Sequence, residues 1–132
     1  MNPALLIIGS VFATLAALLH VVIFYFESIG WTKPAIWKRF GVASQADADT
    51  TQPMAYNQGF YNLFLAVGVA VGVVLLATGV VEAGFTLVLW STLSMVAAAT
   101  VLVTKNPKLA RAAATQGVLP LVAVLFLLLA LI

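Results

Sequence analysis

Four long apolar stretches dominate the chain, at residues 4–26, 56–78, 84–104 and 111–131, and no charged residue lies in the middle of any of them. A stretch of about 20 apolar residues is long enough to cross a bilayer as a helix. Lipid cannot hydrogen-bond the backbone, and these runs of Leu, Ala and Val lack the strict alternation of barrel strands. The pattern therefore predicts an all-α protein with four transmembrane helices in a single domain, residues 1–132.

The first apolar stretch has two interpretations. Asn2 followed by Pro3 fits the start of a helix, with Asn as the cap and Pro in the first turn. A cleaved signal peptide is the alternative, because the segment from Ala13 to Ala17 offers small residues. No basic residue precedes the stretch, and it is longer than the roughly 7–15 apolar residues of a signal peptide. We therefore expect a retained span.

All six basic side chains lie between the apolar stretches or at the edge of one, in the first and third connections. They are Lys33, Lys38, Arg39, Lys105, Lys108 and Arg111. The second connection carries only Glu82. Because basic connections stay in the cytoplasm, we expect the first and third on that side, with Glu82 and both termini outside. The second and third connections are short, so consecutive helices are antiparallel neighbours and we predict an up-down-up-down bundle.

The first connection is the only long one, and its centre mixes large apolar side chains with basic ones around a proline. The apolar side chains are Trp31, Ile36, Trp37 and Phe40. This mixture predicts a short helix in the cytoplasmic membrane interface, with the aromatic rings among the lipid headgroups. The polar continuation from Ser44 to Gln52 is expected to be exposed, and Ser44 three residues before Asp47 could cap a helical turn.

The composition narrows the class of protein. The chain is 64% hydrophobic and 8% charged, whereas an ordinary soluble domain has about 25% charged residues, so lipid must be its main solvent. Because cysteine is absent, disulfides, thiolate nucleophiles and iron–sulfur clusters are excluded. The formal net charge of +2 comes from the connections, as expected for contact with anionic lipid and not with nucleic acid.

Polar side chains gather in the cytoplasmic half of the predicted bundle, where they form a candidate ligand-binding pocket. Its residues are His20, Glu27, Asn57, Gln58, Tyr61, Asn62 and Gln116. His20 and Glu27 are seven residues apart, so on a straight helix they share one face at a separation of roughly 10 Å. Pro120 cannot donate to the Gln116 carbonyl, which leaves that carbonyl free at the same depth as the Gln116 amide.

Each of these residues also has a purely structural interpretation. A single histidine is often an interhelical hydrogen-bond partner, and Glu27 could pair with Lys33 or Lys105. The amides and the tyrosine could simply join helices, where each hydrogen bond is worth about 0.6–2 kcal/mol. Gly68 and Gly72 are four residues apart and predict close helix packing, inside the bundle or at a dimer contact.

Several motifs make the chain recognisable. They are Glu27, Trp31-Thr32-Lys33-Pro34, Phe40-Gly41 and, above all, Asn57-Gln58-Gly59-Phe60-Tyr61-Asn62 followed by Leu65-Ala66 and Gly68. With His20 before them and Gln116-Gly117 and Pro120 after them, they resemble a family of small bacterial four-helix membrane proteins known only as a domain of unknown function. The resemblance implies the bacterial cytoplasmic membrane as the location and supplies no activity. It also implies a set of family positions, which are His20, Glu27, Trp31, Asn57, Gln58, Gly59, Tyr61, Asn62 and Gln116.

The leading functional hypothesis is binding or transport of a small amphipathic or polar molecule, such as a lipid headgroup or a quinone-like compound, in the polar pocket. His20 or Glu27 would respond to protonation, while the amides and Tyr61 would orient the ligand. A structural or partner-binding membrane subunit is the alternative. The four short helices of one chain leave little room for a pore. If the protein forms a transport route across the lipid bilayer, we therefore expect a homo-oligomer with the route between its protomers.

Enzyme, exporter and haem functions are less favoured. His20 could be the general base of an intramembrane enzyme, but Glu27 is beyond hydrogen-bond distance and no catalytic triad or metalloprotease motif is present. A small four-helix multidrug exporter needs a carboxylate inside its first helix, and residues 4–19 contain none. One histidine allows bis-histidine haem ligation only across a dimer. The sequence therefore predicts no metal site and identifies no cofactor.

Overall fold

The computed structural model describes residues 1–132, which form helices and no strands. Four long helices make up the bundle: α1 (Pro3–Phe24), α3 (Gln45–Ala77), α4 (Val81–Lys105) and α5 (Ala110–Leu129). Shorter helical segments extend or connect them: η1 (Tyr25–Ile29), α2 (Pro34–Trp37), η2 (Lys38–Phe40) and η3 (Pro107–Leu109). The long helices, with η1 and η3 added to α1 and α5, are all long and apolar enough to cross a membrane, which confirms the four predicted spans.

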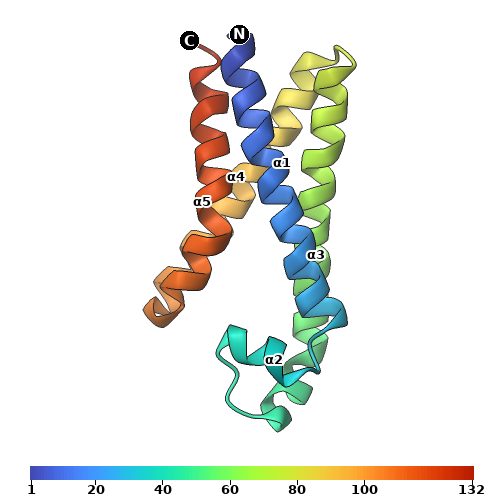
Figure 1. The fold of residues 1–132 in the computed structure, drawn as a ribbon, viewed down its shortest axis with the longest axis vertical. Coiled ribbons are helices and arrows are strands. Elements are labelled where there is room, and N and C mark those ends of the chain that lie inside the picture. The colour runs from blue at the N-terminus through green and yellow to red at the C-terminus, as the bar shows by residue number, and fades with distance from the viewer.

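The four long helices form a ring in which each one packs on two others. α1 packs on α3, α3 on α4, α4 on α5, and α5 returns to α1, whereas α1 and α4 have few contacts across the middle. Both termini lie at one end of the bundle (Figure 1). There the backbone N–H of Asn2 donates a hydrogen bond of 2.7 Å to Ala130 O. The predicted up-down-up-down bundle is confirmed.

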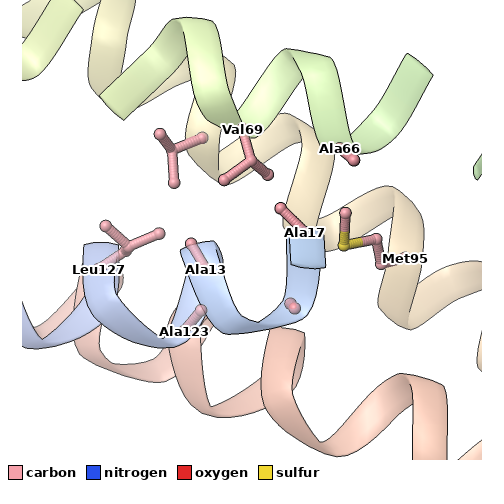
Figure 2. Close-up of a cluster of buried hydrophobic side chains, with 9 residues drawn as sticks. Ala13, Ala17, Ala66, Val69, Met95, Ala123 and Leu127 are labelled. Carbon is pink, nitrogen blue, oxygen red and sulfur yellow. The ribbon is translucent and has the colours of Figure 1, made fainter. Parts of the chain in front are cut away.

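The core of the bundle is built mainly from small side chains. Figure 2 shows Ala13 and Ala17 of α1 facing Val69 of α3, with Leu127 of α5 in the same cluster. Gly9 lets α1 approach α5 closely, because a Cβ on Gly9 would lie 2.9 Å from Leu127 Cγ. Small residues at such contacts favour helix association in lipid, where burial from water provides no driving force.

The close packing predicted for Gly68 and Gly72 lies inside the bundle. A Cβ on Gly68 would collide with Ser91 Oγ, and one on Gly72 would lie 2.6 Å from Val88 Cγ2 and 3.0 Å from Gly84 O. Both glycines therefore face α4 along one stripe of α3. The two helices approach so closely there that a methyl group would push them apart.

α3 begins much earlier than its apolar residues suggest. The predicted span starts at residue 56, but the helix starts at Gln45, so most of the expected polar connection is helical. Ser44 caps this helix, because its Oγ accepts a hydrogen bond of 3.1 Å from Asp47 N, as predicted. Hydropathy marks where lipid ends, whereas a helix can continue into a polar layer when its end is capped.

Residues 31–42 pack on this polar part of α3. Trp31 Nε1 donates to Ala48 O at 2.9 Å, and Trp37 Nε1 donates to Gln45 Oε1 at 3.1 Å. The predicted short helix is present as α2, but the two indoles are only 7% and 4% exposed and form a cluster with Ala48 and Ala55. The expectation that these rings lie among lipid headgroups is wrong, because α3 extends far enough to cover them.

The helices diverge toward the end opposite the termini. In Figure 1 the lower parts of α1 and α3 stay together on one side, while those of α4 and α5 lean to the other. In the same view α2 lies beside the lowest part of α3 and below the end of the α4–α5 pair. There a Cβ on Gly41 would be 3.8 Å from Leu109 Cδ2 of η3. We call the end of the bundle where the helices diverge the splayed end; it contains α2, η2 and η3.

Candidate functional site

Glu27 and Asn62 are in direct contact between η1 and α3. Asn62 Nδ2 donates a hydrogen bond of 2.8 Å to Glu27 Oε2 and another of 3.1 Å to Gln58 O of its own helix. Both side chains are half-buried. The partner of the carboxylate is thus an amide on a neighbouring helix, and not Lys33 or Lys105.

Glu27 lies in a π-helical turn that the sequence pattern does not predict. The turn covers Tyr25–Ile29 and ends where Gly30 N donates to Tyr25 O, five residues back, at 2.8 Å. A π turn has more residues per turn than an α-helix, so the register between His20 and Glu27 differs from that of a straight α-helix. The expectation that these two residues share a face assumes a straight α-helix and stays a prediction.

Ser28 and Gly59 bring η1 and α3 close together. Ser28 Oγ donates a hydrogen bond of 2.8 Å to Tyr56 O. Opposite this bond, a Cβ on Gly59 would collide with Ser28 Oγ and would lie 3.1 Å from Glu27 Cβ. Helix packing therefore explains the glycine within the motif at residues 57–62. Ser28 is not among the predicted site residues, and only its position next to Glu27 marks it in the sequence.

His20 is almost fully buried and bonds to its own helix. Its side chain is 1% exposed, and Nδ1 lies 2.8 Å from Ala16 O. A carbonyl oxygen can only accept a hydrogen bond, so we assign the proton of the neutral imidazole to Nδ1 and a free lone pair to Nε2. No protein group bonds Nε2. The structural interpretation, in which His20 joins two helices by a hydrogen bond, is therefore wrong.

Gln116 lies on α5 at the level of His20. Gly9 of α1 meets Leu127 of α5, and His20 and Gln116 are each eleven residues from that contact along antiparallel helices. Gln116 is half-buried. The register therefore places its side chain and that of His20 at the same depth of the bundle.

The side-chain amide of Gln116 makes no hydrogen bond within the chain. Thr115 is the only residue of α5 whose side chain makes a hydrogen bond, to Arg111 O at 2.8 Å. Pro120 lies inside α5 and is buried. Because proline has no amide hydrogen, the Gln116 carbonyl lacks its usual helical donor. Gln116 thus offers a side-chain amide and a backbone carbonyl at one position.

Asn57, Gln58 and Tyr61 have exposed side chains. Asn57 and Tyr61 continue the stripe of α3 that contacts α4, because they precede Gly68 by eleven and seven residues, about three and two turns. Toward the splayed end α4 has turned away from α3, and no long helix lies over this stripe (Figure 1). We call Asn57 and Tyr61 the uncovered stripe; Gln58 is its neighbour around the helix.

Two hollows in the surface lie away from the seven predicted pocket residues. One, of about 520 Å³, lies beside α3 and α4 and is lined by Leu75, Glu82, Ala83, Thr86, Leu87 and Trp90. The other, of about 380 Å³, lies between α1 and α3, and nine of its ten lining residues are hydrophobic. No group of three or more His, Cys, Asp or Glu side chains is placed to hold a metal ion. The polar pocket stays a prediction.

Side-chain hydrogen bonds between the spanning helices are confined to one contact. The bonds from Asn62 to Glu27 and from Ser28 to Tyr56 both join η1 to α3. Most hydroxyl groups within the other helices bond their own backbone; Thr92, for example, donates to the carbonyl four residues back at 2.8 Å. No side-chain hydrogen bond therefore joins α4 or α5 to another spanning helix; they are held in the ring by packing and, at the end with the termini, by the backbone bond from Asn2 N to Ala130 O.

The comparison with known proteins gives one match. The model of a family described as "Protein of unknown function (DUF1304)" matches residues 14–128, a range that includes all seven predicted pocket residues. No curated protein and no solved structure matches the chain. The match confirms the resemblance to a family of unknown function. It assigns no role to the motif at residues 57–62, whose function stays a prediction.

Proposed function

Because the chain belongs to the DUF1304 family, for which no activity is known, and has four helices able to cross a membrane, we propose a function from the geometry of the splayed end. We propose that the protein binds a small amphipathic or polar molecule between the α1–α3 pair and the α4–α5 pair. Binding serves either transport or retention of this molecule in the membrane. No catalytic step is part of the proposal.

The observation that carries the proposal is the uncovered stripe of α3. Polar groups that face hydrocarbon cost free energy, so membrane proteins turn them toward protein or toward a water-filled space. Asn57 and Tyr61 lie on the face of α3 that α4 covers further along, where Gly68 meets Ser91. Toward the splayed end α4 no longer covers this face. A polar ligand between the helix pairs would supply the missing hydrogen-bond partners.

His20 and Gln116 support the same location. They lie at one level on α1 and α5, by the register of these helices. Nε2 of His20 has no protein partner, and Gln116 has an unused side-chain amide and a carbonyl that lacks its usual helical donor because of Pro120. Donors and acceptors of this kind, few in number within an apolar surround, are typical of small-molecule sites.

Glu27 has a positioning role in this proposal. Its carboxylate accepts the hydrogen bond of Asn62, so it holds the end of α1 against α3. Together with Ser28 it fixes the orientation of α3 and hence of the uncovered stripe. Glu27 and Asn62 would therefore act on the ligand through the placement of the α1–α3 pair.

The orientation in the membrane is part of the proposal. All six basic residues belong to the splayed end or to its connections. Lys38 lies over the Trp37 ring and Arg39 over the Phe26 ring, each with 5.4 Å to the ring centroid. Under the positive-inside rule this end faces the cytoplasm of a bacterial inner membrane, with both termini outside.

Native mass spectrometry of the protein in a gentle detergent tests the proposal. The variants Asn57→Leu and Tyr61→Leu remove polar groups of the uncovered stripe without touching the contact between Glu27 and Asn62. Thr78→Val, just beyond the other end of α3, is the matched control. We expect a co-purifying small molecule with the wild type and the control, and about ten-fold less of it with either stripe variant, since each loses a hydrogen bond to the ligand. A stable wild type free of ligand would refute the proposal.

A partner-binding subunit is the second candidate, and Trp90 favours it. Its side chain is 70% exposed in the hollow that also contains Glu82 and Thr86. Trp is enriched at interfaces, where its ring is covered and its N–H finds an acceptor. If this candidate holds, native spectra will show an assembly of fixed stoichiometry that Trp90→Leu dissociates. The homo-oligomer expected from the sequence would be identified in the same spectra.

A further inference from the structure

The hydrogen bond between His20 Nδ1 and Ala16 O decides which ring nitrogen can meet a ligand. With the proton on Nδ1, Nε2 of the neutral ring is an acceptor. We propose that the molecule bound at the splayed end is a neutral amphiphile with a free hydroxyl group, and that His20 Nε2 accepts the hydrogen bond from this hydroxyl. The inference rests on the proposed binding function and specifies the class of its ligand.

Nε2 of His20 is not enclosed by protein. No side-chain nitrogen or oxygen in the chain is both fully buried and without a hydrogen-bond partner. Nε2 has no partner, so the 1% of His20 that stays exposed includes this atom. The rest of the ring packs on protein. A ligand can therefore approach this side chain only at the nitrogen with the lone pair.

Gln116 lies at the depth of His20 on α5, and its polar groups complement those of His20. Its side-chain amide is a donor, and the carbonyl that Pro120 leaves free is an acceptor. A hydroxyl group is both donor and acceptor. A ligand hydroxyl at this level therefore suits both residues, because it can donate its hydrogen to His20 Nε2 and its oxygen can accept from an amide such as that of Gln116. His20 and Gln116 lie at the same depth of the bundle, so a hydroxyl group bound at that depth would lie at the level of both residues.

Other head groups fit these two residues less well. An ether, an ester, a quinone carbonyl or a fully ionised phosphate has only acceptors, so its oxygen would face the lone pair of Nε2. Leaving a buried acceptor unsatisfied weakens binding by roughly ten-fold or more. A cationic head at this depth would need a carboxylate, and Glu27 already accepts the hydrogen bond of Asn62. Of the head groups compared, the neutral hydroxyl alone supplies a hydrogen to Nε2 without bringing a charge.

The single histidine allows a direct test by nuclear magnetic resonance. With ¹⁵N-labelled histidine, the protein in detergent gives two ring-nitrogen resonances, both from His20. We expect one protonated nitrogen and one unprotonated nitrogen, with the proton on Nδ1. The probes are 4-octylphenol and 4-octylanisole, which share ring and chain and differ in whether the oxygen carries a hydrogen or a methyl group.

We expect 4-octylphenol to shift the Nε2 resonance saturably and to leave Nδ1 in place, and 4-octylanisole to bind at least about ten-fold more weakly. Gln116→Met should weaken 4-octylphenol binding by about ten-fold without changing the tautomer, whereas Thr115→Val, the matched control on the adjacent residue, should not. Gln116→Met therefore reports on ligand contact even if changes at His20 itself disturb folding.

Three results would overturn the inference: a proton on Nε2 in place of Nδ1, equal affinity for the two probes, or no response to either. If the probes fail while native mass spectrometry still finds a molecule that Asn57→Leu removes, only the hydroxyl assignment is lost. If the native spectra show no ligand either, the proposed binding function is lost with it.

Discussion

Asn62 Nδ2 lies 2.8 Å from Glu27 Oε2, and this hydrogen bond joins the π-helical turn at the end of α1 to α3. The two residues are far apart in the sequence and belong to different spans. In a membrane few water molecules are present to replace a lost partner, so each group depends on the other. The contact therefore matters for stability as well as for the orientation of α3.

Loss of this donor should weaken the fold. We expect Asn62→Leu to lower the free energy of unfolding by about 1–3 kcal/mol, because it leaves the Glu27 carboxylate without its partner. Glu27→Gln should have a smaller effect, since its amide oxygen can still accept from Asn62. Thermal unfolding in detergent, followed by circular dichroism, measures both. Asn57→Leu is the matched control, because its amide is exposed; equal losses for Asn57→Leu and Asn62→Leu would argue against the hydrogen bond.

A methyl group at position 59 should separate α1 from α3. We expect Gly59→Ala to destabilise the protein by roughly 1–3 kcal/mol, because its Cβ would collide with Ser28 Oγ. Adding Ser28→Ala should recover part of that loss, since it removes the colliding oxygen. The same unfolding measurement applies to the single and double variants. A Gly59→Ala protein as stable as the wild type would mean that the two helices are further apart than described.

Trp31 should hold residues 31–42 on the polar part of α3. Trp31→Phe keeps an aromatic ring but removes the hydrogen bond of 2.9 Å to Ala48 O, so we expect a loss of about 1 kcal/mol. Faster hydrogen exchange of the backbone amides of residues 31–42 would locate the effect. Trp90→Phe is the control, because Trp90 is 70% exposed and should change stability by less than about 0.5 kcal/mol. Unchanged exchange in Trp31→Phe would contradict this role.

The natural absence of cysteine makes the orientation easy to measure. Ala43→Cys and Val80→Cys place one exposed thiol at opposite ends of the bundle. In intact bacterial cells we expect a membrane-impermeant thiol reagent to label Val80→Cys at once, and Ala43→Cys only after permeabilisation, because basic connections stay in the cytoplasm. The reverse pattern would turn the bundle over and place the splayed end outside.

The spans could be predicted from the sequence because each is apolar over the thickness of a bilayer. The start of α3 could not, since residues 45–55 are mostly polar and their helix depends on the Ser44 cap and on the indoles of Trp31 and Trp37. The π turn at Tyr25–Ile29 also has no sequence signal of its own. It is fixed by packing against α3, a contact between distant parts of the chain.

The candidate site could be predicted in part. Polarity within a span is enough to single out Glu27 and Asn62, which are in contact. Polarity does not say which groups meet, because that depends on helix rotation. The π turn alters this rotation for Glu27, and the outward lean of α4 leaves Asn57 and Tyr61 uncovered. The free lone pair of His20 follows only from its bond to Ala16 O.

The confinement of interhelical side-chain hydrogen bonds to η1 and α3 divides the molecule mechanically. α1 and α3 cannot slide or rotate against each other without breaking the bonds of Asn62 and Ser28. Toward the splayed end, α4 and α5 can shift by repacking apolar surfaces, because their directional bond to the α1–α3 pair, from Asn2 N to Ala130 O, lies at the opposite end of the bundle. Any rocking of the bundle should therefore leave the α1–α3 pair as the stationary frame and make the α4–α5 pair the moving arm.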